Sequence, residues 1–409
     1  MIIFLKKSLV FFTTVATVLL FGGTIEEFEV ELLLPQDNSL NEEHCTLLRG
    51  SNGLKVELVE KKLLVSARTT DGKVLRAFDT TRTVIHLPRQ KFYLTYFPHD
   101  EERGTVIFRG AGIGHVTIPY ILPPGHITKG RYVKQIVHKS RAIVQARRGK
   151  LLSREEFEVP GVPDPVRWDY ERGFRRNREL QFYTDRPENV RVENGYLVLE
   201  ARCENLQPNP QYRKNSRKWF EQRPYYSITS GMVVSKTPFT FGAGTRIDIR
   251  AKIPTGPGLW PAIWGVGVNN LLENGRKAWP ACGEIDILEY FYKIPNSVSM
   301  GNLHYTGPAG KLMQYTGMSP LGFDPGLDWH LYSLEWDRDE MRFYFDDFLV
   351  MLWPVPNQAA NPDLSFEQEF QIRLNLALRD SSTQTGILAM DDLPKQFLVD
   401  YIRIYKLEP

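Results

Sequence analysis

Three carboxylic acids are closely spaced along one short apolar segment of the chain. Glu284, Asp286 and Glu289 lie among aliphatic and aromatic residues in the octet Gly-Glu-Ile-Asp-Ile-Leu-Glu-Tyr at 283–290. These apolar neighbours favour a β-strand, in which positions 284 and 286 share one face and position 289 points to the other. One extra residue between 286 and 289, a β-bulge, would return Glu289 to the face of the other two acids. We therefore expect three acids in a row, facing a cleft.

Such a row of acids has a definite chemical use. Closely placed carboxylates repel each other, so at least one of them should keep its proton above its ordinary pKa. Hydrolysis of a glycosidic bond needs an ionised carboxylate to attack the sugar and a protonated acid to release the leaving oxygen. The alternative is a half-buried strand whose acids alternate with apolar residues without any catalytic role. The octet alone leaves both interpretations open.

Five further segments match one family in the expected order along the chain. The octet itself has the form of a bulged E-x-D-x-x-E signature, and the other matching segments are 177–184 (NRELQFYT), 258–264 (GLWPAIW), 302–305 (NLHY), 329–337 and 398–405. With these segments, the chain from about residue 161 to residue 409 resembles glycoside hydrolase family 16, in particular its laminarinase-like β-1,3-glucanases. Six ordered matches are far more specific than a single motif.

The resemblance implies a fold and a mechanism. The fold would be all-β, with a β-jelly-roll sandwich of two curved antiparallel sheets as the catalytic domain. Glu284 would be the nucleophile of a retaining double displacement, and Glu289 would be the general acid and then the general base. Asp286 would tune both glutamates by repulsion and proton sharing. His304 would bond a carboxylate or the leaving oxygen, with a structural strand histidine as the alternative.

Aromatic and polar residues near the acids are candidates for substrate binding. Trp260, Trp264 and Trp279 are candidate sugar-stacking platforms, because flat apolar rings suit the C–H faces of a pyranose. Core packing is the alternative for each tryptophan, and we expect at least one of the three to lie in the core. By analogy with the family, Asn177 and Arg250 are candidate hydrogen-bond partners of sugar hydroxyls, with surface or structural roles as the alternative.

The chain departs from the family in the loops expected to rim the cleft. Residues 378–382 read Leu-Arg-Asp-Ser-Ser, where the family often has Gly-Gly followed by Trp-Pro-Gly. Arg175 and Arg176 replace the usual Trp-Gly before Asn177, and the strand at 241–250 is longer than usual. These departures leave the reaction in place, but they leave the preferred substrate open.

We expect the chain to divide into three parts. Two lysines precede an apolar run at 9–21, which has the length of a signal-peptide core and is too short to span a membrane. Residues 1–24 are therefore predicted to be a signal peptide, with an uncleaved N-terminal anchor as the alternative. Residues 25–155 contain short alternating runs that predict a β-rich accessory module of unrecognised family. Residues 156–409 are predicted to form the jelly-roll hydrolase domain. Because of the predicted signal peptide, we expect a secreted, extracellular or periplasmic protein.

The accessory module raises the question of sugar binding. Phe92, Tyr93, Tyr96 and Phe97 could form an aromatic platform, but alternation along a strand divides them between two faces. Because the module also contains no tryptophan, we favour core packing for these rings.

The amino-acid composition limits the classes of partner that the protein is expected to bind. The formal net charge is only +3 over 409 residues, so no strong field that would attract nucleic acid is expected. Three cysteines, an odd number, do not form a disulfide framework, and Cys282 is expected to be a buried structural residue. We expect no transmembrane partner and a monomer. The resemblance implies that no cofactor is required, although relatives often hold a structural Ca²⁺, for which Asp400 is a candidate ligand.

The preferred function is that of an exported endo-glycosidase that hydrolyses β-1,3-glucan, laminarin-like, with β-1,3-1,4-glucan left open as a further substrate. A second interpretation is a retaining hydrolase or a transglycosylase that acts on another polysaccharide, such as agar, carrageenan or xyloglucan. A third is a glucan-binding recognition protein without turnover, against which the presence of all three acids counts.

Overall fold

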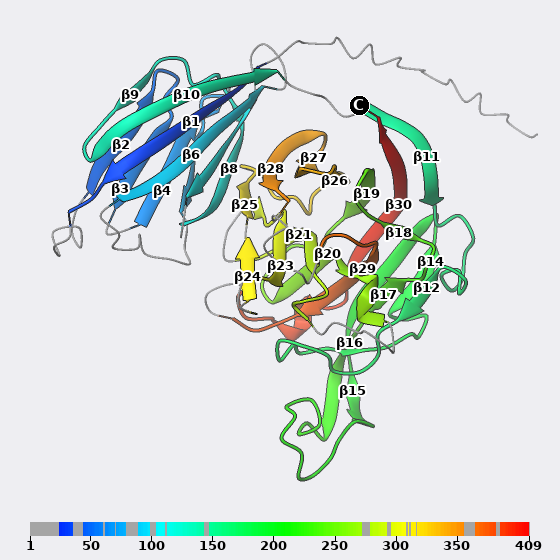
Figure 1. Cartoon of the computed structure of the whole chain (residues 1–409). Coiled ribbons are helices and arrows are strands. Elements are labelled where there is room, and N and C mark those ends of the chain that lie inside the picture. The colour runs from blue at the N-terminus through cyan, green and yellow to red at the C-terminus, as the bar shows by residue number, and fades with distance from the viewer. Residues whose placement is uncertain are drawn as a thin grey trace, which may run out of the picture.

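The computed structural model is built almost entirely of β-strands (Figure 1). The described residues are 24–35, 44–59, 62–69, 71–78, 89–98, 104–110, 113–142, 147–271, 279–292, 296–307, 310, 312–315, 317–355, 365–381 and 385–408. The predicted export segment, 1–24, lies outside these ranges apart from its last residue. The helical structure within them consists of short 3-10 turns, among them η2 (Val268–Leu271) and η5 (Met390–Asp392). Over the same ranges, no helix is both long enough and apolar enough to cross a membrane.

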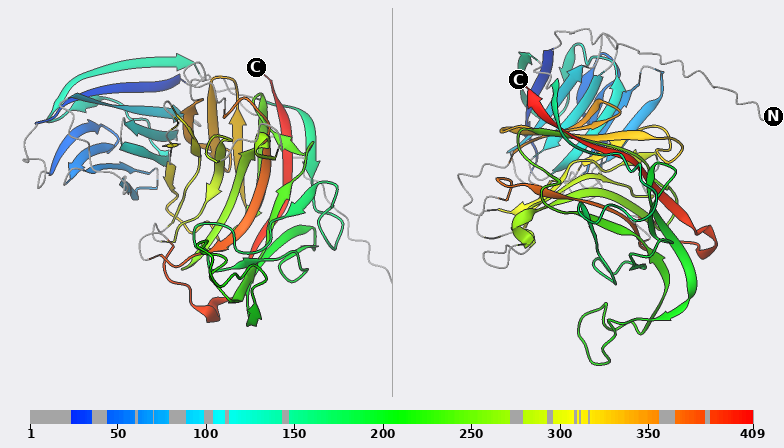
Figure 2. Two further views of the ribbon diagram at one scale, coloured as in Figure 1. Left: turned by 60° about the horizontal axis from the view of Figure 1, so that its bottom comes forward. Right: turned by 90° about the vertical axis from the view of Figure 1, so that its right-hand side faces the viewer.

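Two large, curved sheets form the sandwich that makes up most of the molecule (Figure 2). The ten-stranded sheet has the order β13-β16-β15-β30-β19-β26-β27-β28, with β11 paired to β30 and β14 paired to β15. Its strands are β11 (Arg147–Glu155), β13 (Phe182–Tyr183), β14 (Val190–Glu193), β15 (Tyr196–Pro208), β16 (Tyr225–Ser230), β19 (Thr245–Lys252), β26 (His330–Trp336), β27 (Glu340–Phe345), β28 (Phe348–Pro354) and β30 (Lys395–Glu408).

The eight-stranded sheet carries the acids. Its order is β12-β17-β29-β20-β21-β23-β24, with β18 paired to β29. Its strands are β12 (Trp168–Tyr170), β17 (Met232–Ser235), β18 (Thr240–Phe241), β20 (Leu259–Gly267), β21 (Glu284–Glu289), β23 (Asn302–Thr306), β24 (Leu312–Tyr315) and β29 (Phe370–Leu378). Strand β21 therefore lies inside this sheet, between β20 and β23.

The N-terminal strands, joined by β22 and β25 from later in the chain, build two further sheets beside the sandwich (Figures 1 and 2). The seven-stranded sheet has the order β10-β1-β6-β7-β8-β25-β22, and the five-stranded sheet has the order β5-β4-β3-β2-β9. The strands are β1 (Thr24–Leu33), β2 (His44–Gly50), β3 (Lys55–Val59), β4 (Lys62–Arg68), β5 (Val74–Phe78), β6 (Arg89–Pro98), β7 (Gly104–Gly110), β8 (Ile113–Ile121), β9 (Ile127–Lys129), β10 (Val133–Ala142), β22 (Ser297–Val298) and β25 (Gly317–Pro320).

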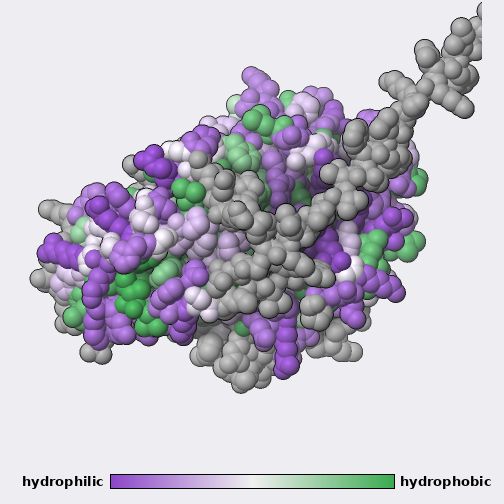
Figure 3. Space-filling model, turned by 90° about the horizontal axis from the view of Figure 1, so that it is seen from above, coloured by the Kyte–Doolittle hydropathy of each residue, from purple (hydrophilic) through white to green (hydrophobic). Residues whose placement is uncertain are grey.

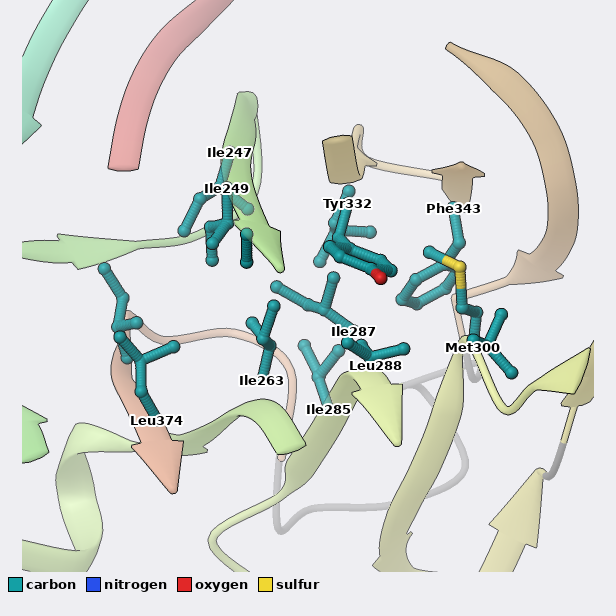
Figure 4. Close-up of a cluster of buried hydrophobic side chains, with 14 of the residues drawn as sticks. Ile247, Ile249, Ile263, Ile285, Ile287, Leu288, Met300, Tyr332, Phe343 and Leu374 are labelled. Atoms are coloured by element: carbon teal, nitrogen blue, oxygen red, sulfur yellow. The ribbon is translucent and has the colours of Figure 1, made fainter. Parts of the chain in front are cut away.

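Two separate apolar cores hold these layers together. The larger core fills the sandwich, where side chains of both sheets meet; Figure 4 shows Ile263 and Ile285 of one sheet against Ile249 and Tyr332 of the other. The smaller core lies between the two N-terminal sheets and contains Phe92. Burying each large side chain of this kind contributes roughly 1.5–3 kcal/mol. The face seen from above in Figure 3 is mostly hydrophilic, with small scattered apolar patches.

These observations confirm the predicted all-β class with a jelly-roll sandwich. In the N-terminal part, Phe92 and Tyr96 are buried in the smaller core, as we favoured, and Phe97 is buried against the larger one. Tyr93 is the partly exposed member of the four rings. Strand β11 lies within the range predicted for the accessory module, and it pairs with β30 of the ten-stranded sheet.

A buried ion cluster ties β19 to β26 in the ten-stranded sheet. The Arg246 guanidinium donates to Asp248 at 2.6 Å and to Glu335 at 2.8 Å. Arg246, Asp248 and Glu335 are each less than 5% exposed. Burial alone would lower the pKa of Arg246, but the charges of Asp248, Glu335 and Asp347 raise it above its ordinary value, so the guanidinium stays charged. A buried charge without its partner is strongly destabilising, so the cluster depends on the arginine.

We predict that Arg246→Met lowers the free energy of unfolding by about 3 kcal/mol, because Asp248 and Glu335 lose the buried cation that they share and keep only Arg148 and Arg342, respectively, as ion-pair partners. Chemical denaturation followed by tryptophan fluorescence measures this change. The matched control is Lys73→Met, which removes an exposed cation paired with Asp71 and should cost less than about 1 kcal/mol. Equal losses for the two variants would contradict the assignment.

Candidate active site

The predicted β-bulge is present in β21. Trp264 of β20 lies opposite Asp286, and Ile263 lies opposite Leu288, so Ile287 is an extra residue without a partner on β20. Ile285, Ile287 and Leu288 are all buried in the sandwich core, and Figure 4 shows them together on that side of the strand. Two consecutive residues can face the core only where the alternation of the strand is broken.

The three acids lie on the face opposite the core. The residues of β20 that lie opposite the three acids are Val266, Trp264 and Ala262. All three belong to a small apolar cluster that is distinct from the sandwich core. Asp286 is buried, whereas both glutamates are partly exposed. The acids therefore form a row on the face of the sheet that is turned away from the sandwich core, with a glutamate at each end of the row and the aspartate between them.

Each glutamate has its own tryptophan donor. The Trp279 indole N–H donates to Glu284 at 3.1 Å, and the Trp260 indole N–H donates to Glu289 at 2.9 Å. The Trp279 side chain is half-exposed, so its ring is open to a sugar in the way predicted for a platform. Trp260 is partly buried and contacts Phe291, with ring centroids 5.6 Å apart. Trp260 thus orients Glu289 as well as bordering the cleft.

Trp264, the third predicted platform, lies in the small buried cluster and is only 8% exposed. Its indole N–H donates to the Asn375 carbonyl oxygen at 2.7 Å, and the guanidinium groups of Arg176 and Arg373 each lie 5.1 Å from its ring. Both arginines pair with Glu171. This buried tryptophan supports the floor of the cleft, and little of its ring is open to a sugar.

Strand β23 places a histidine beside the acids, as predicted. His304 lies opposite Glu284 in the sheet, and its Nε2 is 3.2 Å from Asp286 and 3.7 Å from Glu284. The other ring nitrogen, Nδ1, is 2.8 Å from the Gln314 side-chain amide. This second contact fixes the orientation of the ring. The position of His304 therefore links the aspartate with the glutamate at one end of the row.

Asn302 is a site residue that the sequence reasoning missed. Its amide nitrogen donates to Glu289 at 2.6 Å, and its carbonyl oxygen accepts from the Gly317 backbone N–H at 2.9 Å. Ser299 also contacts Asn302, which lies opposite Asp286 in the sheet. Alternation would have identified it, because residues 302 and 304 share one face of a strand.

Burial raises the pKa of all three carboxyl groups. It is the largest cause for each, because the charged form loses its contacts with water. The pKa rises to about 8 for Glu284, to about 8 for Glu289 and to about 7 for Asp286. Charge on Asp286 adds to the rise at both glutamates, whereas His304 opposes it. The group therefore holds protons at neutral pH and titrates as a coupled set.

The structure places two other predicted substrate contacts differently. Asn177 is exposed at a turn with φ of 54°, and its amide nitrogen is 3.4 Å from the carboxylate of buried Glu179. Arg250 is in β19 of the other sheet, where it forms an ion pair with Asp400 and lies over the Trp329 ring. Arg250 is therefore not brought together with the acids.

The same ion pair bears on the candidate calcium ligand. Asp400 is already neutralised by Arg250, so its surroundings do not fit a Ca²⁺ site, which needs several free oxygen ligands. Among the described residues, the side chains spaced to hold a metal ion are Glu284, Asp286 and His304. Because these are the cleft acids and their histidine, the group is accounted for by the site already described.

We predict that Asp286→Asn changes how stability depends on pH. Each raised carboxyl makes the folded chain bind more protons than the unfolded chain, so stability falls as pH rises from about 4 to about 8. The Asp286→Asn substitution removes the contribution of this carboxyl group to the pH dependence of stability. It also removes part of the rise in the pKa of both glutamates. The variant should therefore gain about 1–2 kcal/mol relative to the parent at pH 8, and less at pH 5.

Urea unfolding at four pH values measures this difference. The exposed residue Asp169 supplies the matched control, because Asp169→Asn should leave the pH dependence as it is in the parent. If the unfolding free energies of the Asp286 variant and the parent ran parallel across this range, the carboxyl group of Asp286 would not be coupled in the way described.

Comparison with known proteins identifies the family. The model of glycosyl hydrolases family 16 matches residues 179–390. A β-glucanase from Rhodothermus marinus is 34% identical over 269 residues, which cover 63% of this chain and 85% of that protein. The solved laminarinase from the same organism has a TM-score of 0.50 and 32% identity, and the match covers 64% of this chain and 98% of that one.

A further solved structure comes from work on endo-acting O-glycanases that members of the human gut microbiota express to initiate mucin breakdown. It has a TM-score of 0.55 and 32% identity, and it covers 63% of this chain and 91% of that chain. The family match spans more than half of the 409 residues and includes the acid strand. The chain therefore belongs to glycosyl hydrolase family 16 and is an endo-β-1,3-glucanase-like glycoside hydrolase with a polysaccharide substrate.

Proposed function

We propose that the protein is an exported hydrolase that cleaves internal β-1,3 linkages of a laminarin-like glucan with retention of configuration. The observation that carries the proposal is the bulged strand, which brings Glu284, Asp286 and Glu289 to one face of the sheet. The resemblance to β-glucanases and laminarinases supports β-1,3-glucan as the substrate. Export is supported by the lysines and apolar run that open the sequence.

The environments of the two glutamates support different roles. Glu289 lies between the Trp260 indole and the Asn302 amide, and we assign it protonation of the leaving oxygen. Glu284 lies 3.7 Å from the His304 Nε2 at the other end of the row, and we assign it the attack on the anomeric carbon that a retaining mechanism requires of the second carboxylate. Asp286 lies between them and disfavours simultaneous ionisation.

The proposed reaction has two steps. Glu284 attacks the anomeric carbon while Glu289 transfers its proton to the departing glycosidic oxygen, which leaves a covalent glycosyl ester on Glu284. Glu289, now ionised, then takes a proton from water as that water attacks the same carbon, and the ester bond breaks. Two inversions at one carbon return the β-configuration. Half-exposed Trp279 would stack against a sugar beside Glu284.

A substrate panel tests the proposed function. We expect reducing ends to appear from laminarin as a ladder of short oligosaccharides, with lichenan as a weaker substrate. Early products should carry the β-configuration by proton NMR before mutarotation. Agarose, κ-carrageenan, xyloglucan and mucin O-glycans represent the other substrates in this family. Preferential cleavage of one of these would replace the β-1,3-glucan assignment, and an initial α-anomer would contradict double displacement.

We predict that Glu284→Gln lowers kcat on laminarin by at least about 10⁴-fold, because the amide cannot form the glycosyl ester. Binding of laminari-oligosaccharides should persist within roughly threefold, since the shape of the side chain is kept. Isothermal titration measures the binding, and reducing-sugar release measures the turnover. An active variant would remove Glu284 from the role of nucleophile.

We also predict that only one of two tryptophan substitutions at the acids moves the alkaline limb of the pH profile. The Trp260 indole lowers the pKa of Glu289, so Trp260→Phe should raise that pKa and move the alkaline limb of kcat/KM to higher pH. The rate at the optimum should fall roughly tenfold with the loss of one charge-assisted hydrogen bond. Trp279→Phe is the matched control, because Trp279 donates to Glu284. An alkaline limb that moves only in the control would reverse the acid assignment.

A further inference from the structure

An insertion between β15 and β16 concentrates positive charge beside the turn that precedes β13. Residues 209–223 contain five basic residues and one acidic residue, which gives this segment a net charge of +4, more than the +3 of the whole chain. Strand β15 extends well beyond the sandwich and carries the insertion at its end (Figure 1). The basic residues are Arg213, Lys214, Arg217, Lys218 and Arg223.

Arg223 attaches this insertion to the turn that precedes β13. Its guanidinium lies 4.8 Å from the Phe174 ring and 5.1 Å from the Trp219 ring, and it donates to the Glu179 backbone carbonyl at 3.0 Å. Over the described residues, no carboxylate pairs with Arg223. Its pKa is lowered by partial burial and by the charge of Arg178, so two cations repel each other here.

Arg178 lies on the same turn and is exposed. Asn177 and Arg178 have consecutive positive φ angles of 54° and 55°, a tight conformation that is uncommon for residues other than glycine. In the described part of the chain, no ion pair or hydrogen bond holds the Arg178 side chain. Neighbouring arginines differ, because Arg172 pairs with Asp185 and Arg176 pairs with Glu171.

A third arginine connects this turn to the proton-donating end of the acid row. The Leu180 backbone N–H donates to the Leu378 carbonyl at 2.7 Å, which brings the turn next to Arg379. The Arg379 guanidinium lies 5.6 Å from the ring of Trp260, which itself donates to Glu289. No carboxylate partner of Arg379 exists within the described ranges. Arg379 is also one of the residues at which the sequence departs from the family pattern.

We propose that Arg178, Arg223 and Arg379 form a subsite for an anionic substituent on the glycan, either a sulfate ester or a carboxylate. The inference rests on the proposed function and narrows its substrate to a charged glucan. Guanidinium groups bind such oxyanions in bidentate fashion, and a cleft concentrates their field. Arg178 and Arg223 repel each other, none of the three arginines has a carboxylate partner among the described residues, and a bound anion would relieve this unbalanced positive charge.

Laminarin and its chemically sulfated and carboxymethylated derivatives test the subsite in the full-length protein. We expect the ratio of kcat/KM for an anionic derivative over neutral laminarin to exceed one and to fall as NaCl rises from about 0.05 to about 0.5 M. Arg178→Gln and Arg379→Gln should each lower that ratio by roughly fivefold to tenfold. The two derivatives show whether sulfate or carboxylate is preferred.

Lys406→Gln is the matched control, because Lys406 is exposed on β30 of the other sheet and carries the same charge. For this variant, the ratio of kcat/KM for an anionic derivative over neutral laminarin should equal that of the parent. Arg223→Lys keeps the charge but loses the fork of donors, and it should lower the ratio if its fold, checked by circular dichroism, is intact. Unchanged ratios in the Arg178 and Arg379 variants would overturn the subsite.

Failure of the proposed function gives a different result. If neutral laminarin and both derivatives are not cleaved, the glucanase assignment fails, and the subsite is then tested by binding alone. In that case, titration of Glu284→Gln protein with sulfated and neutral laminari-oligosaccharides should show tighter binding of the sulfated form, weakened by Arg178→Gln. Equal affinities would overturn the subsite independently of turnover.

Discussion

The site depends on the packing of two adjacent side chains, Ile287 and Leu288, into the same core. Because both face the ten-stranded sheet, the strand must contain an extra residue, and Glu289 is turned to the face of the other acids. The burial of apolar surface behind the strand therefore stabilises an arrangement of three carboxyls that repel one another in front of it. Apolar packing on one face of β21 therefore holds the three carboxyl groups in place on its other face.

The elements around β21 fix each acid from a different direction. Strand β20 contributes the Trp260 donor, and β23 contributes Asn302 and His304. Asn302 is in turn held by the backbone of Gly317, at the start of β25, and β25 pairs in parallel with β8 of the N-terminal part. A continuous series of hydrogen bonds and strand pairings thus runs from the N-terminal sheets to the proton-donating glutamate.

Local sequence patterns predicted much of this arrangement. The alternation of acids with apolar residues predicted the strand, and the position of Glu289 required the bulge that the structure contains. His304 contacts a carboxylate, as its place on the strand after the acids indicated, whereas the hydrogen bonds from Trp279 and Trp260 to the glutamates were not predicted. The strand, the bulge and the position of His304 could be predicted because they depend on residues close together in the chain or on a signature of fixed spacing.

Other features depend on pairings between distant segments. Asp400 and Arg250 are brought together by the pairing of β19 with β30, so no local pattern distinguished an ion pair from a calcium ligand. Strands β11 and β30 pair although most of the sandwich sequence lies between them, so no local sequence pattern could have predicted this pairing. Trp264 and Trp279 were both predicted to be platforms. The two arginines that cover the Trp264 ring come from distant parts of the chain, so the sequence around Trp264 did not indicate that it is covered.

The most direct test of the account is a carbon-13 NMR titration of protein labelled at the side-chain carboxyls of aspartate and glutamate. We expect a small group of carboxyl resonances that titrate above pH 6, far from the ordinary range near 4, and that move together because their charges interact. Their assignment by single substitutions should identify Glu284, Asp286 and Glu289. If all three carboxyls titrated independently below pH 5, they would not share one buried cleft floor, and the account would fail.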